Sequence, residues 1–377
     1  MCSSDLRGVK QAGEAARHAR AQVREGNALG RDAARQAYSS SVRSFRAWDK
    51  AWQRAWSSVS TETSVRRELR AAARGDAPIV VGPWLGEVGY EALYWVPFVR
   101  WFASYYRVPR ERLVVVSRGG VSSWYADISD RYIELLDLFT PQEFAARNVE
   151  RQASGDQKQL GVAGFDRDIL ERLQAQVGGR LHLCHPSAMF RLMRRFWLGN
   201  ESLQLVLDHT RHVMQTESRV ELPGLPERYV AVKFYTARSL PDTRSTRESL
   251  RALIRHVAAD LPVVMLTTRL ALDEHDDYLF EGLTNVQTLD PWMTPQNNLG
   301  VQSEVIRRAQ TFVGTCGSLA WLAPMLGTET LAIYADEHLL TPHLYAASQI
   351  YPSIGAAPFT PLHIRAVQAL APEAAGR

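Results

Sequence analysis

A chain of 377 residues is too long for one ordinary hydrophobic core, so we expect two globular domains and an appendage. With 46% hydrophobic and 22% charged residues, it has the composition of a soluble globular protein. No stretch approaches the roughly 20 apolar residues of a membrane span, and no signal peptide is visible. Three scattered cysteines exclude a disulfide framework or a zinc cluster, so the expected compartment is the cytoplasm.

Residues 1–75 are predicted to form a basic helical extension. They hold 15 Lys or Arg against 7 Asp or Glu, whereas the net charge of the whole chain is only +4. Aromatic residues between Tyr38 and Trp56 recur at helical spacing and predict one aromatic face. That face either packs on protein or lies on an anionic membrane surface, which would place the protein at the inner face of the membrane. Residues 1–6 read like a translated sequencing adapter, so we expect the natural chain to extend further upstream.

Residues 76–222 are predicted to form a Rossmann-like domain. The apolar strand 79–81 leads into a Gly-rich turn, a long apolar helix and a second strand at 113–116, which together make a βαβ unit. We expect a helix near residues 129–148 and a further strand at 181–184.

Residues 223–377 are predicted to form a second Rossmann-like domain. Short apolar strands alternate here with helices of 10–15 residues, which indicates a parallel sheet covered on both faces. The expected strands are 229–234, 263–267, 285–289, 311–313 and 330–334. The predicted fold class is therefore α/β, with two Rossmann-like domains facing a cleft and an N-terminal helical extension.

The turn after strand 311–313 is the clearest candidate for a phosphate site. Gly314 and Gly317 would let a ligand approach the backbone, and Thr315 and Ser318 add hydroxyl donors. We expect a helix from this turn to Gly327, whose free N–H groups would suit a diphosphate at the carboxyl end of the sheet.

Two stretches of the chain resemble GT-B glycosyltransferases, especially the heptosyltransferase-like group. Gly314–Ser318, followed by Gly327-Thr328, resembles that group's donor-binding turn, and Gly86–Glu91 with Pro97 resembles its N-terminal turn. The resemblance implies a nucleotide-sugar donor on the second domain and a glycan or lipid-linked acceptor on the first. It also implies an inverting reaction in bacterial surface polysaccharide synthesis, with no metal or other cofactor.

An inverting transferase needs a carboxylate that takes the proton of the acceptor hydroxyl. Glu87 and Glu91 are the candidates, with a slight preference for Glu87. Each could instead be a carboxylate that only complements a helix dipole. This chain has no Asp at the position where the family places its acidic residue, so both glutamates stay open.

The resemblance implies a cation near the donor phosphates, where Lys233 and Arg238 follow the first strand of the second domain. Thr268 follows the next strand at the same sheet edge. His185 is a weaker, acceptor-side candidate, because a lone histidine at a strand end is more often structural. The weakest donor-side candidates are Asp290, Gln302, His338 and His343.

Two other functions fit this pattern. A polysaccharide pyruvyl transferase uses a similar two-domain scaffold, and a degenerate scaffold could serve as a non-catalytic sugar-binding subunit. No cluster of residues has metal-ligand spacing, and we expect no nucleic-acid partner.

Overall fold

The computed structural model describes residues 61–155, 159–215, 222, 224–268, 276–289 and 292–370. These residues belong to the unit Thr61–Arg377, one of the two units into which the chain divides. The aromatic face expected between Tyr38 and Trp56 lies outside the described residues. Within the described ranges, no helix is both long and apolar enough to span a bilayer.

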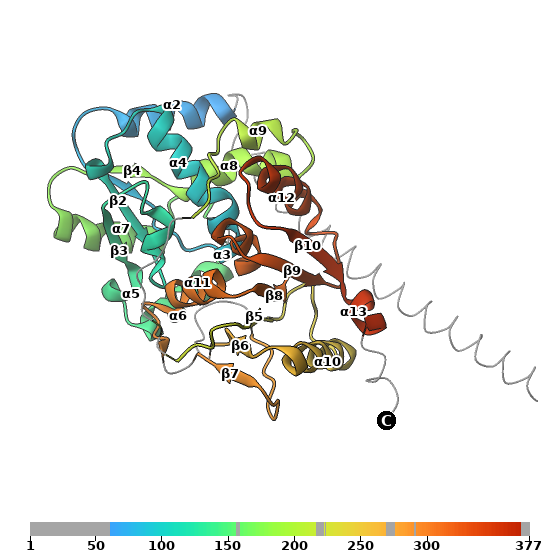
Figure 1. Cartoon of the computed structure of the whole chain (residues 1–377). Helices are drawn as coiled ribbons and strands as arrows, with labels where there is room; N and C mark the ends of the chain where they lie inside the picture. Colours follow the sequence, from blue (N-terminus) through green and yellow to red (C-terminus); the bar gives the residue numbers. More distant parts are fainter. Residues whose placement is uncertain are drawn as a thin grey trace, which may run out of the picture. The chain divides into compact units, whose positions relative to one another are not determined.

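The first half of the unit is built on a four-stranded parallel sheet with the strand order β3-β2-β1-β4 (Figure 1). Its strands are β1 (Ile79–Val81), β2 (Leu113–Ser117), β3 (Arg131–Glu134) and β4 (His182–Cys184). The expected strands at 79–81, 113–116 and 181–184 are confirmed. The helix expected near 129–148 is wrong in part, because residues 131–134 form edge strand β3 and the helix there begins only at Pro141.

The second half is built on a six-stranded parallel sheet with the order β10-β9-β8-β5-β6-β7. Its strands are β5 (Val230–Lys233), β6 (Val263–Met265), β7 (Val286–Thr288), β8 (Thr311–Thr315), β9 (Glu329–Tyr334) and β10 (Phe359–His363). All five strands expected here are present, and two parallel sheets confirm the predicted fold class. The sixth strand, β10, contains Pro361, which a sheet tolerates only at its edge, and β10 pairs with β9 alone.

Helices cover both faces of each sheet, as expected for parallel strands. The α-helices are α2 (Thr61–Ala73), α3 (Val88–Tyr90), α4 (Val96–Tyr105), α5 (Leu135–Leu138), α6 (Pro141–Ala153), α7 (Gly164–Val177), α8 (Pro186–Trp197), α9 (Gln204–Leu207), α10 (Arg244–Asp260), α11 (Asn298–Arg308), α12 (Thr341–Ser353) and α13 (Ile364–Leu370). A π-helical turn, η1 (Glu91–Trp95), joins α3 to α4. Short 3-10 turns are η2 (Arg110–Arg112), η3 (Val121–Tyr125), η5 (Ser318–Trp321) and η6 (Ala323–Leu326).

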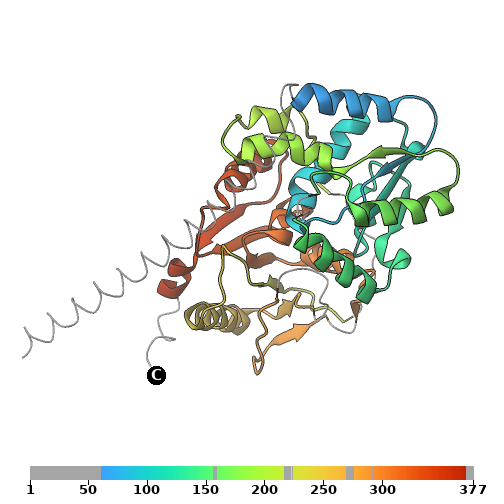
Figure 2. The ribbon, with the colours of Figure 1, turned by 180° about the vertical axis from the view of Figure 1, so that it is seen from behind.

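Alternate residues of each strand enter different hydrophobic clusters. Val80 packs with residues of α6 and α7, whereas Val81 packs with α2, α4 and α8. In the second sheet, Val230 and Val232 pack with α10 and α13, whereas Ala231 faces the other side. Helices α6 and α7 are the green helices nearest the viewer in Figure 2.

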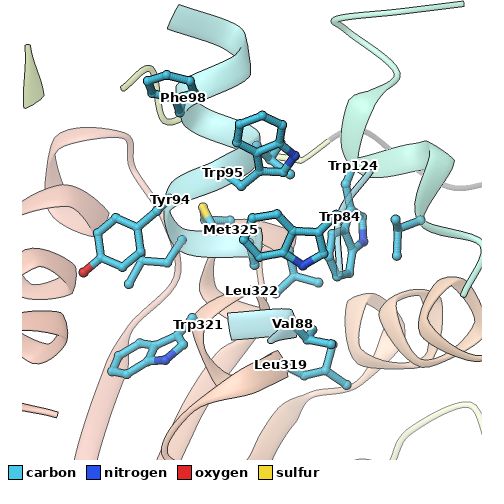
Figure 3. Packing of buried hydrophobic residues seen from close by; sticks show 14 of the residues in the cluster. Trp84, Val88, Tyr94, Trp95, Phe98, Trp124, Leu319, Trp321, Leu322 and Met325 are labelled. Atoms are coloured by element: carbon cyan, nitrogen blue, oxygen red, sulfur yellow. The ribbon is translucent and has the colours of Figure 1, made fainter. Parts of the chain in front are cut away.

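The largest cluster is shared by both halves. Trp84, Trp95 and Trp124 of the first half belong to the same buried cluster as Leu319 and Met325 of the second (Figure 3). The two sheets are therefore joined through a continuous apolar core.

Helix α2, the last part of the predicted basic extension, is packed against the first half. Its Val65, Leu69 and Ala72 are buried, and it contacts α8 and β4. Glu68 forms an ion pair with buried Arg191. The segment 61–73 is thus an integral part of this unit.

Candidate functional site

The turn after β1 has a backbone that only glycine fits at its first position. Gly82 has a φ of +121°, and a Cβ there would lie 2.4 Å from the carbonyl oxygen of Val116. Buried Gln159 holds the next residues, because its Nε2 donates to the carbonyl oxygen of Pro83 at 2.8 Å and its Oε1 accepts from the N–H of Leu85 at 2.8 Å. Close packing against Val116 and the two hydrogen bonds from Gln159 therefore fix the turn.

Immediately after this turn the helix widens into the π-helical turn η1, where the N–H of Val96 bonds to the carbonyl oxygen of Glu91, five residues back. Pro97 has no N–H to donate to Leu93. The imidazole Nε2 of His212 donates to the Leu93 carbonyl oxygen instead, at 2.8 Å. Single π-turns are frequent at functional sites. Here the π-turn begins at a candidate base.

Glu91 is completely buried, and its two carboxylate oxygens differ. Its Oε1 accepts hydrogen bonds from Ser117 Oγ at 2.6 Å and from the hydroxyl of Tyr125 at 2.7 Å. Its Oε2 has no hydrogen-bond partner among the described residues. Burial raises the pKa of Glu91 from 4.5 to about 7, although the two hydroxyls and nearby Arg118 counteract the effect. Glu91 therefore titrates in the range that suits a general base.

Glu87, the other candidate base, lies one turn earlier at the N-cap of α3. Its side chain is exposed and makes no capping hydrogen bond to that helix. The two glutamates thus occupy opposite environments, one in solvent and one in the core.

The second-half turn lies at the end of β8. Gly314 is still within the strand, where a Cβ would lie 2.6 Å from the carbonyl oxygen of Lys233. The Thr315 hydroxyl is buried, donates to the carbonyl of Tyr235 and accepts from its N–H, both at 3.0 Å. The Thr315 hydroxyl therefore hydrogen-bonds the backbone just after β5, the neighbouring strand.

Gly317 and Ser318 form the turn itself. Gly317 has a φ of +147°, and a Cβ there would lie 2.4 Å from the hydroxyl of Tyr235. Ser318 is half-buried, and its hydroxyl makes no hydrogen bond to the part of the chain that the structure describes. Ser318 is thus the residue of this turn whose hydroxyl is available to a ligand.

The helix expected from this turn to Gly327 is wrong as an α-helix. Two 3-10 turns, η5 and η6, take its place, and Gly327 ends the second with a φ of +89°. Pro324 is the physical cause, because it has no N–H to bond to Ala320 and so interrupts any α-helix across this segment. The helix-dipole argument for a diphosphate site is correspondingly weaker.

The two candidate turns touch each other. A Cβ on Gly89 would lie 2.9 Å from the N atom of Ser318 and 2.9 Å from the ring of Trp321. A second contact joins the halves at Gly300, whose N–H donates to the carbonyl oxygen of Gly119 at 2.9 Å. The structure therefore brings the Glu87–Glu91 turn and the Gly314–Ser318 turn together. A cleft elsewhere between the halves stays a prediction.

Lys233 does not stand free at the end of β5. Its Nζ forms an ion pair with Asp277 Oδ2 at 2.9 Å and donates to the carbonyl oxygen of Leu266 at 3.1 Å. The N–H of Thr268 donates to the same Asp277 oxygen at 2.7 Å. Asp277 thus joins two predicted donor-side residues and offsets the charge of Lys233. Arg238, by contrast, is exposed in a tight turn between Ala237 and Leu240.

His185 is buried in a hydrogen-bond network beneath the first turn. Its Nδ1 accepts from the N–H of Ser187 at 3.2 Å, so its Nε2 carries the proton that is donated to Asp166 at 3.1 Å. Asp166 in turn accepts from Gln159 at 2.9 Å. This arrangement supports the structural interpretation of His185.

Of the weakest candidates, His343 holds the two halves together. Its Nδ1 lies 2.7 Å from the hydroxyl of Tyr94, and its ring packs edge-on against Tyr90 and Tyr94 of the first half. Gln302 is buried in α11, His338 lies on an exposed turn, and Asp290 falls outside the described residues.

Sequence reasoning missed Ser117, Tyr125 and Asp277. Ser117 and Tyr125 follow an ordinary apolar strand with no motif around them, and Asp277 lies in an acidic stretch that looks like a solvated surface. Only the fold brings them to the candidate residues. No group of three His, Cys, Asp or Glu side chains that could hold a metal occurs within the described ranges.

Comparison with known proteins gives only distant similarity. No family model matches the chain, and no curated protein matches it. The similar solved structures include the iron-containing dodecameric glycosyltransferase TibC from enterotoxigenic E. coli H10407, at 12% identity over 68% of this chain and 60% of that one, with a TM-score of 0.38. The E. coli heptosyltransferase WaaC with ADP matches at 14% identity over 79% of this chain and 100% of that one, with a TM-score of 0.36. The glycosyltransferase of kitacinnamycin matches at 12% identity over 80% and 90% of the two chains, with a TM-score of 0.32.

These structures are glycosyltransferases, and one is a heptosyltransferase, the group that the sequence motifs resemble. The chain spans about 60% of the length of TibC. Similarity at these TM-scores does not bear on the activity of this chain.

Proposed function

We propose that this chain is a glycosyltransferase that moves a sugar from a nucleotide-sugar to a glycan or lipid-linked acceptor. The observation that carries the proposal is Glu91, a buried carboxylate with a pKa of about 7 at the carboxyl end of a parallel sheet. Two residues before it, Gly89 contacts the Gly-rich turn of the second sheet at Ser318. A candidate base and a candidate phosphate site therefore meet where α/β sheets bind ligands.

In the proposed reaction, Glu91 takes the proton of the acceptor hydroxyl as its oxygen attacks the anomeric carbon. The bond from that carbon to the diphosphate breaks, and the nucleoside diphosphate leaves with the electron pair. Attack from the face opposite the leaving group inverts the anomeric centre. The raised pKa of buried Glu91 supports this choice of base.

On the donor side, Ser318 and Arg238 have the best-placed groups for the diphosphate. The Ser318 hydroxyl is available, and exposed Arg238 can supply positive charge without a metal ion. Lys233 contributes less, because Asp277 already offsets its charge.

The finer proposal is a role in bacterial surface polysaccharide synthesis at the cytoplasmic face of the membrane. The basic surplus of residues 1–75 supports it, and two of those cations, Arg67 and Arg70 on α2, are exposed. Sedimentation with vesicles of anionic phospholipid tests this contact, and equal sedimentation with neutral vesicles would contradict it.

Ligand binding and turnover test the enzyme itself. Thermal unfolding with UDP, GDP, ADP or CMP is expected to show stabilisation by one nucleotide, because a ligand that binds the folded state raises its stability. Stabilisation by phosphoenolpyruvate alone would favour a pyruvyl transferase, and no stabilisation by any ligand would favour a non-catalytic subunit.

With the donor identified, Glu91→Gln is expected to lower kcat by about 100-fold or more, the usual contribution of a general base. In the wild type, kcat/KM should rise with pH and reach half its maximum near pH 7, where Glu91 ionises. Glu87→Gln is the matched control and should keep most of the activity. The reverse pattern would transfer the role of base to Glu87.

A further inference from the structure

Two hydroxyl groups hold the Glu91 carboxylate in one orientation. Ser117 lies at the carboxyl end of β2 and Tyr125 at the end of η3, and both side chains are buried. Both donate to the same oxygen, Oε1, at 2.6 and 2.7 Å. The other oxygen, Oε2, is buried and receives no hydrogen bond from the described residues.

This asymmetry has a chemical consequence. An oxygen that accepts two hydrogen bonds is less basic, so a proton added to the carboxylate goes to the other oxygen. Two fixed donors also remove the freedom of the carboxylate to rotate. A proton that Glu91 takes up is therefore held on one defined atom, Oε2.

We propose that Ser117 and Tyr125 are positioning residues, which bind Glu91 Oε1 and direct proton transfer to Oε2. For its catalytic meaning the inference rests on the proposed function. Neither side chain needs to touch the substrate, because each acts through Glu91.

Other charged groups near Glu91 also affect its pKa. Arg118, next to Ser117 on the chain, favours its ionised form, and Glu134 on β3 disfavours it. Glu134 has a phenol partner of its own, Tyr132, which donates to its Oε2 at 3.0 Å. Tyr132 interacts with Glu91 only through its charge and makes no hydrogen bond to it. Tyr132→Phe therefore removes a phenol from a neighbouring buried carboxylate while keeping both hydrogen bonds to Glu91, and serves as the matched control.

The first measurement needs no enzymatic activity. The carboxyl C=O band that is present in the wild type and absent in Glu91→Gln reports the protonation of Glu91 by infrared spectroscopy across pH. In Tyr125→Phe and in Ser117→Ala, its midpoint should rise by about one pH unit or more, because each loses a hydrogen bond to the ionised form. In Tyr132→Phe the midpoint should move much less than in either of these variants, because both hydrogen bonds to Glu91 remain.

The second measurement is the pH dependence of kcat/KM. Its midpoint should move upward with the infrared midpoint in Tyr125→Phe and Ser117→Ala, while KM stays within about twofold, since no substrate contact is lost. If Tyr125→Phe fails to fold, Ser117→Ala alone provides the test, because it removes only one oxygen atom from a small side chain. A merely structural role would lower the yield or thermal stability and leave both midpoints in place.

Two results would overturn the inference: an unmoved infrared midpoint in both variants, or an equal movement in Tyr132→Phe. These results are separable from failure of the proposed function. If the infrared midpoint rises in the variants but the protein has no transferase activity, Ser117 and Tyr125 do hydrogen-bond Glu91 as inferred, and the proposed transferase function is wrong. Transferase activity with unmoved midpoints would support the transferase and reject the hydrogen-bond role of Ser117 and Tyr125.

Discussion

Glu91 shows how the surroundings of one residue decide its chemistry. Glu87 and Glu91 are the same residue type one helical turn apart, yet one is exposed and the other lies in the core. Removing a carboxylate from water disfavours its charged form, and two hydroxyl donors repay only part of that penalty. The buried glutamate therefore binds its proton up to about pH 7, well above the range of an exposed one.

This difference predicts a dependence of stability on pH. Between pH 4.5 and about 7 the folded protein holds a proton on Glu91 that the unfolded chain has released, so stability falls as pH rises through this range. The free energy of unfolding of the wild type should fall relative to that of Glu91→Gln by up to about 3 kcal/mol across it. Urea unfolding at a series of pH values measures the difference. Glu87→Gln is the control, and its free energy of unfolding should change with pH as that of the wild type does. If the free energy of unfolding of Glu91→Gln also changes with pH as in the wild type, the pKa of Glu91 is not raised.

At the scale of the element, Glu91 begins the π-helical turn η1, and Pro97 follows the turn at the start of α4. The proline leaves the carbonyl of Leu93 without its usual main-chain donor, and the His212 side chain reaches it from a later segment. Burial lowers the pKa of His212 to about 4, so at neutral pH its ring is uncharged and donates through Nε2.

Replacing His212 with Ala should lower the free energy of unfolding by about 1–3 kcal/mol, because a carbonyl loses its side-chain donor. In a Pro97→Ala background, where residue 97 has an N–H, the same change should cost less. Denaturant unfolding of the two single variants and the double variant gives the coupling free energy between Pro97 and His212. Strict additivity would mean that Pro97 and His212 do not share the Leu93 carbonyl.

Apolar runs and turn residues predicted the central strands of both sheets, because buried parallel strands are continuous apolar segments. They also predicted the edge strands β4 and β7. Edge strands β3 and β10 were missed, since Arg131 and Pro361 depart from that pattern. The motifs located the two candidate turns. The partners Ser117, Tyr125 and Asp277 could not be predicted, because each reaches its glutamate or lysine across 26 to 44 residues of chain. Local periodicity carries no information about such contacts.

At the scale of the whole described unit, the halves are joined by close backbone contact as well as by apolar packing. Gly89 lies against the backbone of Ser318, and Trp321 shares a buried cluster with Trp84 and Trp95. Backbone atoms cannot move aside as a flexible side chain can, so this contact leaves no room for even a methyl group.

Gly89→Ala should therefore lower the free energy of unfolding by about 1–3 kcal/mol, the usual cost of overpacking. Gly161→Ala is the control, because a Cβ at Gly161 meets nothing within 4 Å. Thermal unfolding of both variants compares them directly. Equal stabilities would show that the two turns separate easily in solution.

The core shared by both halves also has a consequence for synthesis on the ribosome. Trp84 and Trp95 leave the exit tunnel early, whereas Leu319, Trp321 and Met325 of the same buried cluster are made more than 200 residues later. At about 5–20 residues per second, the nascent first half waits on the order of 10 s or more with this apolar surface open to water. During that interval the growing chain presents to chaperones the surface that its own C-terminal part later covers.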